Sequence, residues 1–264
     1  MSLLRTVATS LMMVTVLTVT NVEAAGEKKL SVKGSAATTA WGTPTLTDWN
    51  GVWRRVNKPG SVDIMFLKVE PTPLYAPYLK VANEARDKGL ETGHFARCLP
   101  AGMPMMASLV YPAEFIVRPH QINLLYEIGG DRRIRMNGTH PDYLEPTFRG
   151  DSIGHWEGDT LVIDTVALTT TTVIIGGARH SNRMRIIERM REVSPGIIEN
   201  QLRVEDPLAF MKPIEYTVTY EQAKNESVME VACEKNVEAT EFKNTVDVFE
   251  MIPEPEQTVV HWAE

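Results

Sequence analysis

Three histidines and two acidic residues are the side chains of this sequence best suited to acid–base chemistry near neutral pH. The imidazoles of His140, His155 and His180 titrate close to that pH. Glu188 and Asp164 stand in strand patterns, where burial would raise the pKa of an inward carboxyl group. A histidine base and a carboxylic acid together can move protons in lyase, isomerase or hydrolase reactions. The catalytic candidates are His140, His180, Glu188 and His155.

Each candidate also has a structural explanation. His140 and His180 follow turn-type residues and could be ordinary loop side chains. His155 could face solvent from a strand. Glu188 alternates with apolar residues and so could be the acid of a buried salt bridge. The possible cationic partners for such a bridge are Arg132 and Arg135.

A ligand of this site would need an apolar and aromatic wall with a few polar groups. Residues in predicted strands that could supply such a wall are Trp156, Tyr126, Glu127, Asp164 and Tyr216. Met103, Met105 and Met106 could line an adaptable pocket, or they could fill a gap in the core. The expected partner is a small apolar or aromatic molecule.

Metal and cofactor motifs are absent from the sequence. There is no Walker loop, no Gly-x-Gly-x-x-Gly, no Gly-x-Ser-x-Gly and no His-Glu-x-x-His. The spacings of His140, His155 and His180 match no local zinc pattern. We therefore expect neither a metal nor an organic cofactor.

The stretch Gly150–Thr165 reads as two strands joined by a tight turn. If Gly158-Asp159 is a two-residue loop, one face carries polar side chains and the other is apolar. A three-residue loop would shift the register by one residue and exchange the faces. The two-residue loop places Ile153, His155, Glu157, Thr160, Val162 and Asp164 on one face, and Trp156, Leu161 and Ile163 on the other.

Period-two alternation of apolar and polar residues dominates the chain after residue 112. It predicts eight to ten antiparallel strands in a closed or nearly closed barrel, with a two-sheet sandwich as the alternative. One amphipathic helix, from about Leu74 to Lys88, should cover an end of the sheet. The β-branched run Thr169–Ile175 also has strand character. The inward sets include Ile122, Leu124 and Tyr126; Met184, Ile186, Glu188 and Met190; Ile198, Asn200, Leu202 and Val204; and Ile214, Tyr216, Val218 and Tyr220.

The composition along the chain divides it into four predicted segments. Residues 1–24 have the charge, apolar run and small residues of a cleaved export signal, with a membrane anchor as the alternative. Residues 25–47 read as a flexible leader, residues 48–235 as a single β-barrel domain, and residues 236–264 as an acidic tail packing on the barrel. The protein is therefore expected in the periplasm or secreted, with no other membrane-spanning segment.

The net charge argues against some classes of binding partner, and the two cysteines allow one disulfide. The formal net charge is −7, and no basic block interrupts it, which argues against nucleic acid and anionic lipid surfaces. Cys98 and Cys233 could form one disulfide in an oxidising compartment or remain buried thiols. The sequence leaves the oligomeric state open.

Several segments, taken in order, resemble a large family of uncharacterised secreted bacterial proteins. Its hallmark, Gly-x-Ser-Ile-Gly-x-Trp-Glu-Gly-Asp-Thr-Leu-Val-x-x-Thr, is complete at Gly150–Thr165, and the likeness spans residues 48–220. It implies export and a lipocalin-like, β-rich fold, and it carries over no activity. The other matching segments are Asp48–Trp53, Cys98-x-Pro100, Pro112–Glu127, Arg132–Pro141, His180-Ser181, Glu188-Arg189 and Asp206-Pro207.

Two functions fit these observations best. The favoured hypothesis is an exported, cofactor-independent enzyme acting on a small molecule held in a lipocalin-like barrel. His140 or His180 would be its base and Glu188 its acid, and Trp156 with Tyr126 would contact the ligand ring. The alternative is a periplasmic binding protein of the same fold without turnover. A structural role is a third, weaker hypothesis.

Overall fold

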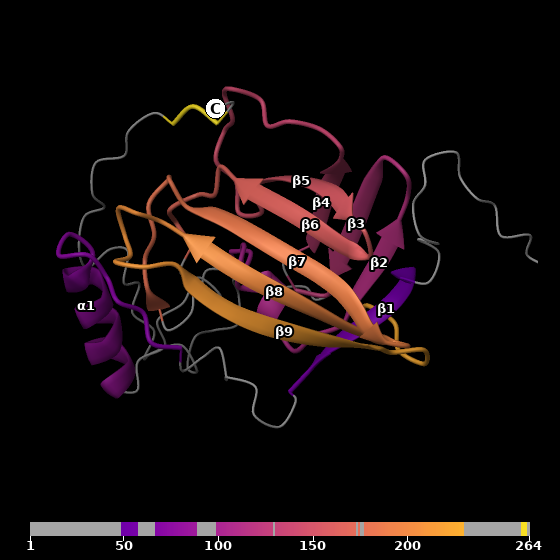
Figure 1. The fold of residues 1–264 in the computed structure, drawn as a ribbon. Helices are drawn as coiled ribbons and strands as arrows, with labels where there is room; N and C mark the ends of the chain where they lie inside the picture. The colour runs from indigo at the N-terminus through magenta and orange to yellow at the C-terminus, as the bar shows by residue number, and fades with distance from the viewer. Residues whose placement is uncertain are drawn as a thin grey trace, which may run out of the picture. The chain divides into compact units, whose positions relative to one another are not determined.

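Nine β-strands close on themselves to form a barrel, drawn in chain order in Figure 1. The structure, a computed structural model, describes residues 49–57, 67–88, 99–128, 130–172, 174, 177–229 and 260–262. The predicted mainly-β barrel with one α-helix is thus confirmed in the described residues. The strands are β1 (Gly51–Val56), β2 (Ala113–Val117), β3 (Gln121–Tyr126), β4 (Gly130–Met136), β5 (Asp151–Glu157), β6 (Thr160–Val166), β7 (Arg185–Ser194), β8 (Ile197–Glu205) and β9 (Ile214–Gln222).

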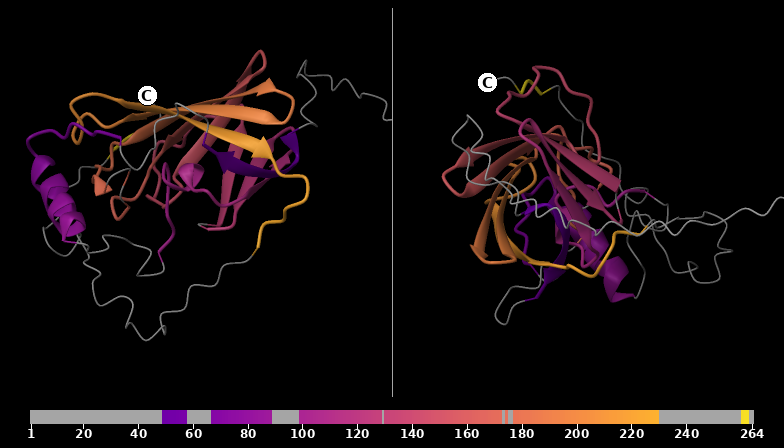
Figure 2. Two further views of the ribbon diagram at one scale, coloured as in Figure 1. Left: turned by 90° about the horizontal axis from the view of Figure 1, so that it is seen from below. Right: turned by 90° about the vertical axis from the view of Figure 1, so that its right-hand side faces the viewer.

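Each strand pairs with its neighbour in the chain, and β1 pairs with β9 to close the ring. Figure 2 shows the indigo strand β1 beside the orange strand β9. Eight of these nine junctions are antiparallel, as predicted. The junction between β4 and β5 is parallel, and the two strands are connected by residues 137–150.

The central hairpin has the two-residue loop on which the sequence prediction depended. Glu157 is paired with Thr160, which leaves Gly158-Asp159 as the loop. Gly158 has φ of 64°, as the first position of a type II′ hairpin turn requires. Leu161 and Ile163 are therefore buried inside, whereas His155 faces outward and is exposed.

Alternate residues of every strand point into the barrel and form its core, as period two demands. On β7 the inward set is Ile186, Glu188 and Met190, and all three are buried. On β9 the inward set includes Tyr216 and Tyr220. The alternation predicted for β3, β7, β8 and β9 is confirmed residue by residue.

Two segments outside the strands complete the core. Helix α1 (Ala76–Asp87) buries Tyr78, whose ring lies under the Arg179 guanidinium, 5.1 Å from the ring centroid. The segment before β2 ends in a short 3-10 turn, η4 (Met106–Ser108), which is buried. Met103, Met105 and Met106 belong to the main apolar cluster, so they fill the core rather than line an open wall.

One predicted strand is wrong. The described residues of 169–175 form turns instead of pairing in a ladder. The Thr172 hydroxyl donates to the Thr169 carbonyl (3.1 Å), and such local bonds offer the backbone an alternative to a sheet.

Other sequence predictions fall outside the described residues. These are the export signal at 1–24, the leader at 25–47, Cys98, Cys233 and most of the tail at 236–264. Of the tail, Trp262 donates its backbone N–H to the Asp142 carbonyl (3.4 Å). Within the ranges given above, no helix is both long and apolar enough to span a membrane.

Candidate functional site

A buried ion pair crosses the interior of the barrel. Arg132 on β4 and Glu188 on β7 are each 1% exposed, and Nη2 of the guanidinium donates to Oε2 of the carboxylate. Their strands are separated by β5 and β6, so both side chains reach toward one another past the inward face of those strands. The salt bridge that the sequence offered for Glu188, with Arg132 as partner, is confirmed.

Three uncharged side chains hold this pair in place. The Ser152 hydroxyl accepts from Nε and Nη2 of Arg132, both at 3.2 Å, and the Thr165 hydroxyl accepts from Nη2 at 2.8 Å. Asn200 Nδ2 donates to the other oxygen of Glu188 at 2.8 Å. Arg132, Glu188, Ser152, Thr165 and Asn200 are called the interior cluster below.

Burial in the interior of the barrel disfavours the charged forms of side chains. Burial works against the Arg132 cation, yet the Glu188 carboxylate raises the pKa of that guanidinium above its ordinary value. Burial raises the pKa of Tyr126 to about 12, despite the positive charge of Arg132 nearby. Burial likewise raises the pKa of Tyr216 and Tyr220. All three tyrosines are therefore neutral at physiological pH.

Two polar atoms of the interior cluster have no hydrogen-bond partner in the described part of the chain. Nη1 of Arg132 and Oδ1 of Asn200 are both buried, and neither has a hydrogen-bond partner in the described part of the chain. Nε1 of Trp156, on the inward face of β5, is also buried and without a hydrogen-bond partner among the described residues. Buried polar atoms are nearly always satisfied in folded proteins, so these atoms mark a place where a polar group belongs.

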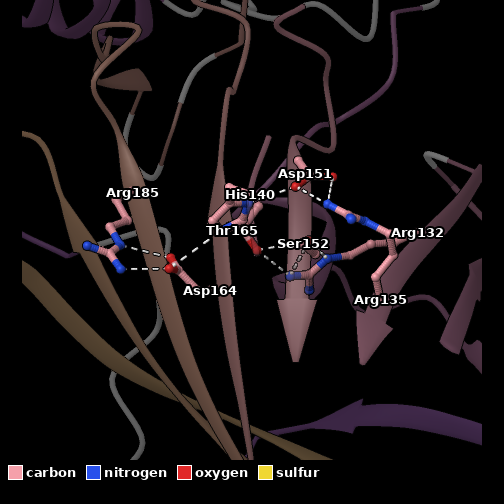
Figure 3. Close-up of polar contacts among 8 residues, drawn as sticks. All are labelled: Arg132, Arg135, His140, Asp151, Ser152, Asp164, Thr165 and Arg185. Carbon is pink, nitrogen blue, oxygen red and sulfur yellow. Dashed lines mark hydrogen bonds and ion pairs between the residues drawn. The ribbon is translucent and has the colours of Figure 1, made fainter. Parts of the chain in front are cut away.

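A second polar group lies on the outer surface of the barrel (Figure 3). His140, in the connection between β4 and β5, places Nδ1 2.7 Å from Asp151 Oδ2 and Nε2 3.5 Å from Asp164 Oδ2. Arg135 and Arg185 bind these carboxylates from their other sides. These five residues are called the outer histidine cluster below.

Charge pairing sets the titration of the outer histidine cluster. Burial works against protonation of His140, but the carboxylates of Asp164 and Asp151 raise its pKa above the ordinary value of 6.5. Burial also disfavours the Asp164 anion, yet His140 and Arg185 lower its pKa from 3.8 to about 2. His140 therefore holds its proton more tightly than a free imidazole does.

The pKa shifts of His140 and Asp164 predict how the stability of the protein depends on pH. Since the folded protein holds the His140 proton more tightly than the unfolded chain, the free energy of unfolding should fall as pH rises above 6.5. The Asp164 contribution, up to about 2 kcal/mol, should be lost as pH falls from 3.8 toward 2. In His140→Asn the alkaline decline should disappear, which urea titrations between pH 5 and pH 9 would measure.

The matched control for this prediction is His155→Asn, which changes an exposed histidine on the neighbouring strand β5. That variant should keep the wild-type decline above pH 6.5. If His140→Asn retained the decline as well, another group would be responsible for it.

The remaining predicted site residues lie apart from both clusters. His155 is exposed and contacts Glu157 at 3.2 Å. His180 is buried, with Nε2 2.7 Å from the Thr172 hydroxyl and Nδ1 2.9 Å from the Ser181 carbonyl. Glu127 accepts from the Met229 backbone N–H at 3.4 Å and does not face the interior cluster.

The predicted site residues are thus divided between the inner and the outer face of the barrel. Glu188, Tyr126, Tyr216 and Trp156 are on the inner face, whereas His140 and Asp164 are on the outer face. The structure does not bring a histidine base and Glu188 together. No group of three or more His, Cys, Asp or Glu residues among those described is placed to hold a metal ion.

Five polar residues of these clusters are not among the site residues predicted from the sequence, namely Asn200, Ser152, Thr165, Asp151 and Arg185. Asn200 had been placed on the inward face by its alternation, but its amide was not considered as a partner for Glu188. Ser152 and Thr165 belong to the hallmark segment, where their inward position follows from the hairpin register. The same register places Asp151 on the outward face of β5. Its contact with His140 could not be derived, because the connection that carries His140 has no periodicity.

Several solved structures match the chain in comparisons with known proteins. The crystal structure of the fluorescent protein UnaG N57A mutant aligns with a TM-score of 0.32 at 12% sequence identity, covering 67% of this chain and 96% of the UnaG chain. No protein-family profile matches the chain. No curated protein matches it either. The barrel assignment rests on the strand pairing itself.

Proposed function

We propose that this protein binds a small molecule inside its barrel, at the interior cluster, without chemically converting it. One observation carries the proposal: Arg132 Nη1 and Asn200 Oδ1 are buried beside a completed ion pair and lack partners among the described residues. An unsatisfied buried polar atom costs about 1–3 kcal/mol. A bound polar group that formed hydrogen bonds with both atoms would remove this cost.

The surroundings of the interior cluster also suit a binding site. Pockets for small molecules are mostly apolar, with a few polar groups that fix orientation. Tyr126 and Tyr216 are buried near the ion pair, and the inward face of β5 carries the Trp156 ring. These aromatic side chains are among those that the sequence predicts for the wall of a ligand site.

Binding accounts for these observations better than turnover does. An acid–base enzyme needs a group inside the barrel that gains or loses a proton near neutral pH. Glu188 is occupied by Arg132 and Asn200, and the raised pKa values of the three tyrosines keep them protonated. The outer histidine cluster lies on the opposite face of the wall. The export signal expected at residues 1–24 would place the binding function in the periplasm or outside the cell.

Native mass spectrometry of the protein purified from its natural compartment, followed by a thermal-shift screen of aromatic and terpenoid compounds, tests the proposal. We expect a retained molecule or a rise in Tm with at least one compound class, since binding to the folded state stabilises it. The Tm rise should be lost in Asn200→Leu and kept in Gln201→Leu, the exposed neighbour on β8.

Three other outcomes would decide against the proposal. With no retained molecule and no Tm rise, the interior would be filled, and the cluster would be structural. Equal loss in the Asn200 and Gln201 variants would move the site elsewhere. Conversion of the retained molecule by the purified protein would restore the enzyme hypothesis.

A further inference from the structure

We infer that the ligand of the barrel is electrically neutral and carries a head group with both a hydrogen-bond acceptor and a donor, such as a carboxamide or a hydroxyl, on an apolar body. The inference rests on the proposed function and adds to it the chemical class of the ligand. It follows from a hydrogen-bond inventory and a charge balance of the interior cluster.

Arg132 has a hydrogen-bond donor without a partner among the residues described. A guanidinium has five N–H hydrogens. Those on Nε and Nη2 of Arg132 are directed at Ser152, Thr165 and Glu188. The Tyr126 hydroxyl also interacts with the guanidinium by a hydrogen bond, but Nη1 itself has no partner in hydrogen-bonding geometry among the described residues. A ligand must therefore offer an acceptor oxygen or nitrogen at this place.

Asn200 has a hydrogen-bond acceptor without a partner in the described ranges. Asn200 uses Nδ2 to donate to Glu188, and this bond fixes which end of the amide faces the carboxylate. Its Oδ1 atom is then an acceptor without a donor in the described structure. Nδ2 of Asn200 and Nη2 of Arg132 bind the two oxygens of the same carboxylate, so both unpartnered atoms belong to groups that are bound to Glu188. One head group with an acceptor and a donor could serve the two atoms.

The charge balance excludes an ionised head group. Arg132 and Glu188 together carry no net charge, and both are 1% exposed. A carboxylate ligand would satisfy Nη1, but it would add an uncompensated anion to an interior that already keeps its tyrosines neutral. It would also set an anionic oxygen against Oδ1 of Asn200, which can only accept. An ammonium ligand would meet Oδ1 but would oppose the Arg132 cation.

The rest of the ligand should be apolar. The inward neighbours of the interior cluster include Ile163, Leu202 and Val218, each of which is buried. These side chains offer no further hydrogen-bonding groups. A bound water is the competing explanation for the two unpartnered atoms, since ordered water commonly satisfies such groups.

A matched ligand series separates these explanations. The probes are 2-naphthamide, 2-naphthol, 2-naphthoate and naphthalene, together with benzamide, phenol, benzoate and benzene for a smaller pocket. Affinities for the full chain would be measured by calorimetry at pH 7.5. We expect the amide or the alcohol of at least one skeleton to bind at least about tenfold more tightly than its carboxylate and its hydrocarbon, because only these complete both bonds.

Substitution of the acceptor sharpens the test. In Asn200→Leu the advantage of the amide over the hydrocarbon should fall to about threefold or less, whereas Gln201→Leu should leave it unchanged. If Asn200→Leu does not fold, the wild-type series still decides. Binding of the carboxylate as tightly as the amide, or of the hydrocarbon equally well, would overturn the neutral head group and leave the binding function standing. Failure of all eight probes and of the wider screen would overturn both, and the two atoms would hold water.

Discussion

Removing the Glu188 side chain, as in Glu188→Leu, should lower the free energy of unfolding by about 3–5 kcal/mol. The variant leaves Arg132 charged, buried and without its anion, and breaking one partner of a buried pair has costs of this size. For a domain of this length the corresponding fall in Tm is roughly 6–20 °C. Urea and thermal unfolding followed by circular dichroism would measure it.

The reciprocal variant, Arg132→Met, should behave differently with pH. Glu188 would then be a buried carboxyl without its cation, and a carboxyl can take up a proton, whereas a guanidinium cannot release one. The loss of stability in Arg132→Met should therefore shrink as pH falls from 8 to 5, and the loss in Glu188→Leu should stay constant.

The double variant provides the control for both single changes. Arg132→Met with Glu188→Leu removes both charges and should recover most of the lost stability, since apolar replacements of buried pairs are often nearly neutral. Losses below 1 kcal/mol in both single variants would contradict this account and would mean that water hydrates the charges inside the barrel.

Gly150→Ala should destabilise the protein by about 3 kcal/mol or more. Gly150 has φ of 67°, and a Cβ there would clash with the Val166 carbonyl oxygen and lie 2.9 Å from Thr165 Cγ2. The left-handed conformation alone costs a non-glycine residue about 1–2 kcal/mol, and the clash with backbone adds to it. Thermal unfolding of the variant would measure the effect.

Gly158→Ala is the matched control. Gly158 also has positive φ, at 64°, but a Cβ there would meet nothing within 4 Å. Its loss should therefore stay near about 1–2 kcal/mol, the cost of the conformation alone. Equal losses in the two variants would show that the contact with Val166 is relieved by a small backbone shift.

Most of the strands could be predicted from the sequence because period two is a local signal. Glu188 stands between Ile186 and Met190 on one inward face, and the turn at Gly158-Asp159 set the register of its neighbours. The parallel junction could not be predicted in the same way. Asn137-Gly138 has the residues of a hairpin turn, and nothing local distinguishes it from one.

The site was less predictable because it depends on which side chains meet across the barrel. Alternation placed Glu188 inward, but choosing between Arg132 and Arg135 required the strand order and the faces of β4. Arg135 faces outward and binds Asp151, whereas Arg132 faces inward. His140 lies in an aperiodic connection, so its place on the outer surface depends on the path of residues 137–150.

That path has a topological origin. In a closed ring whose neighbouring strands all run antiparallel, direction must alternate and return to its start, so the number of strands must be even. This barrel has nine, an odd number, and at least one junction must therefore be parallel. The parallel junction is β4–β5, and its connection has to travel back along the barrel, as a hairpin turn cannot. His140, from which we expect the alkaline loss of stability, thus occupies a segment that the odd parity of the ring requires.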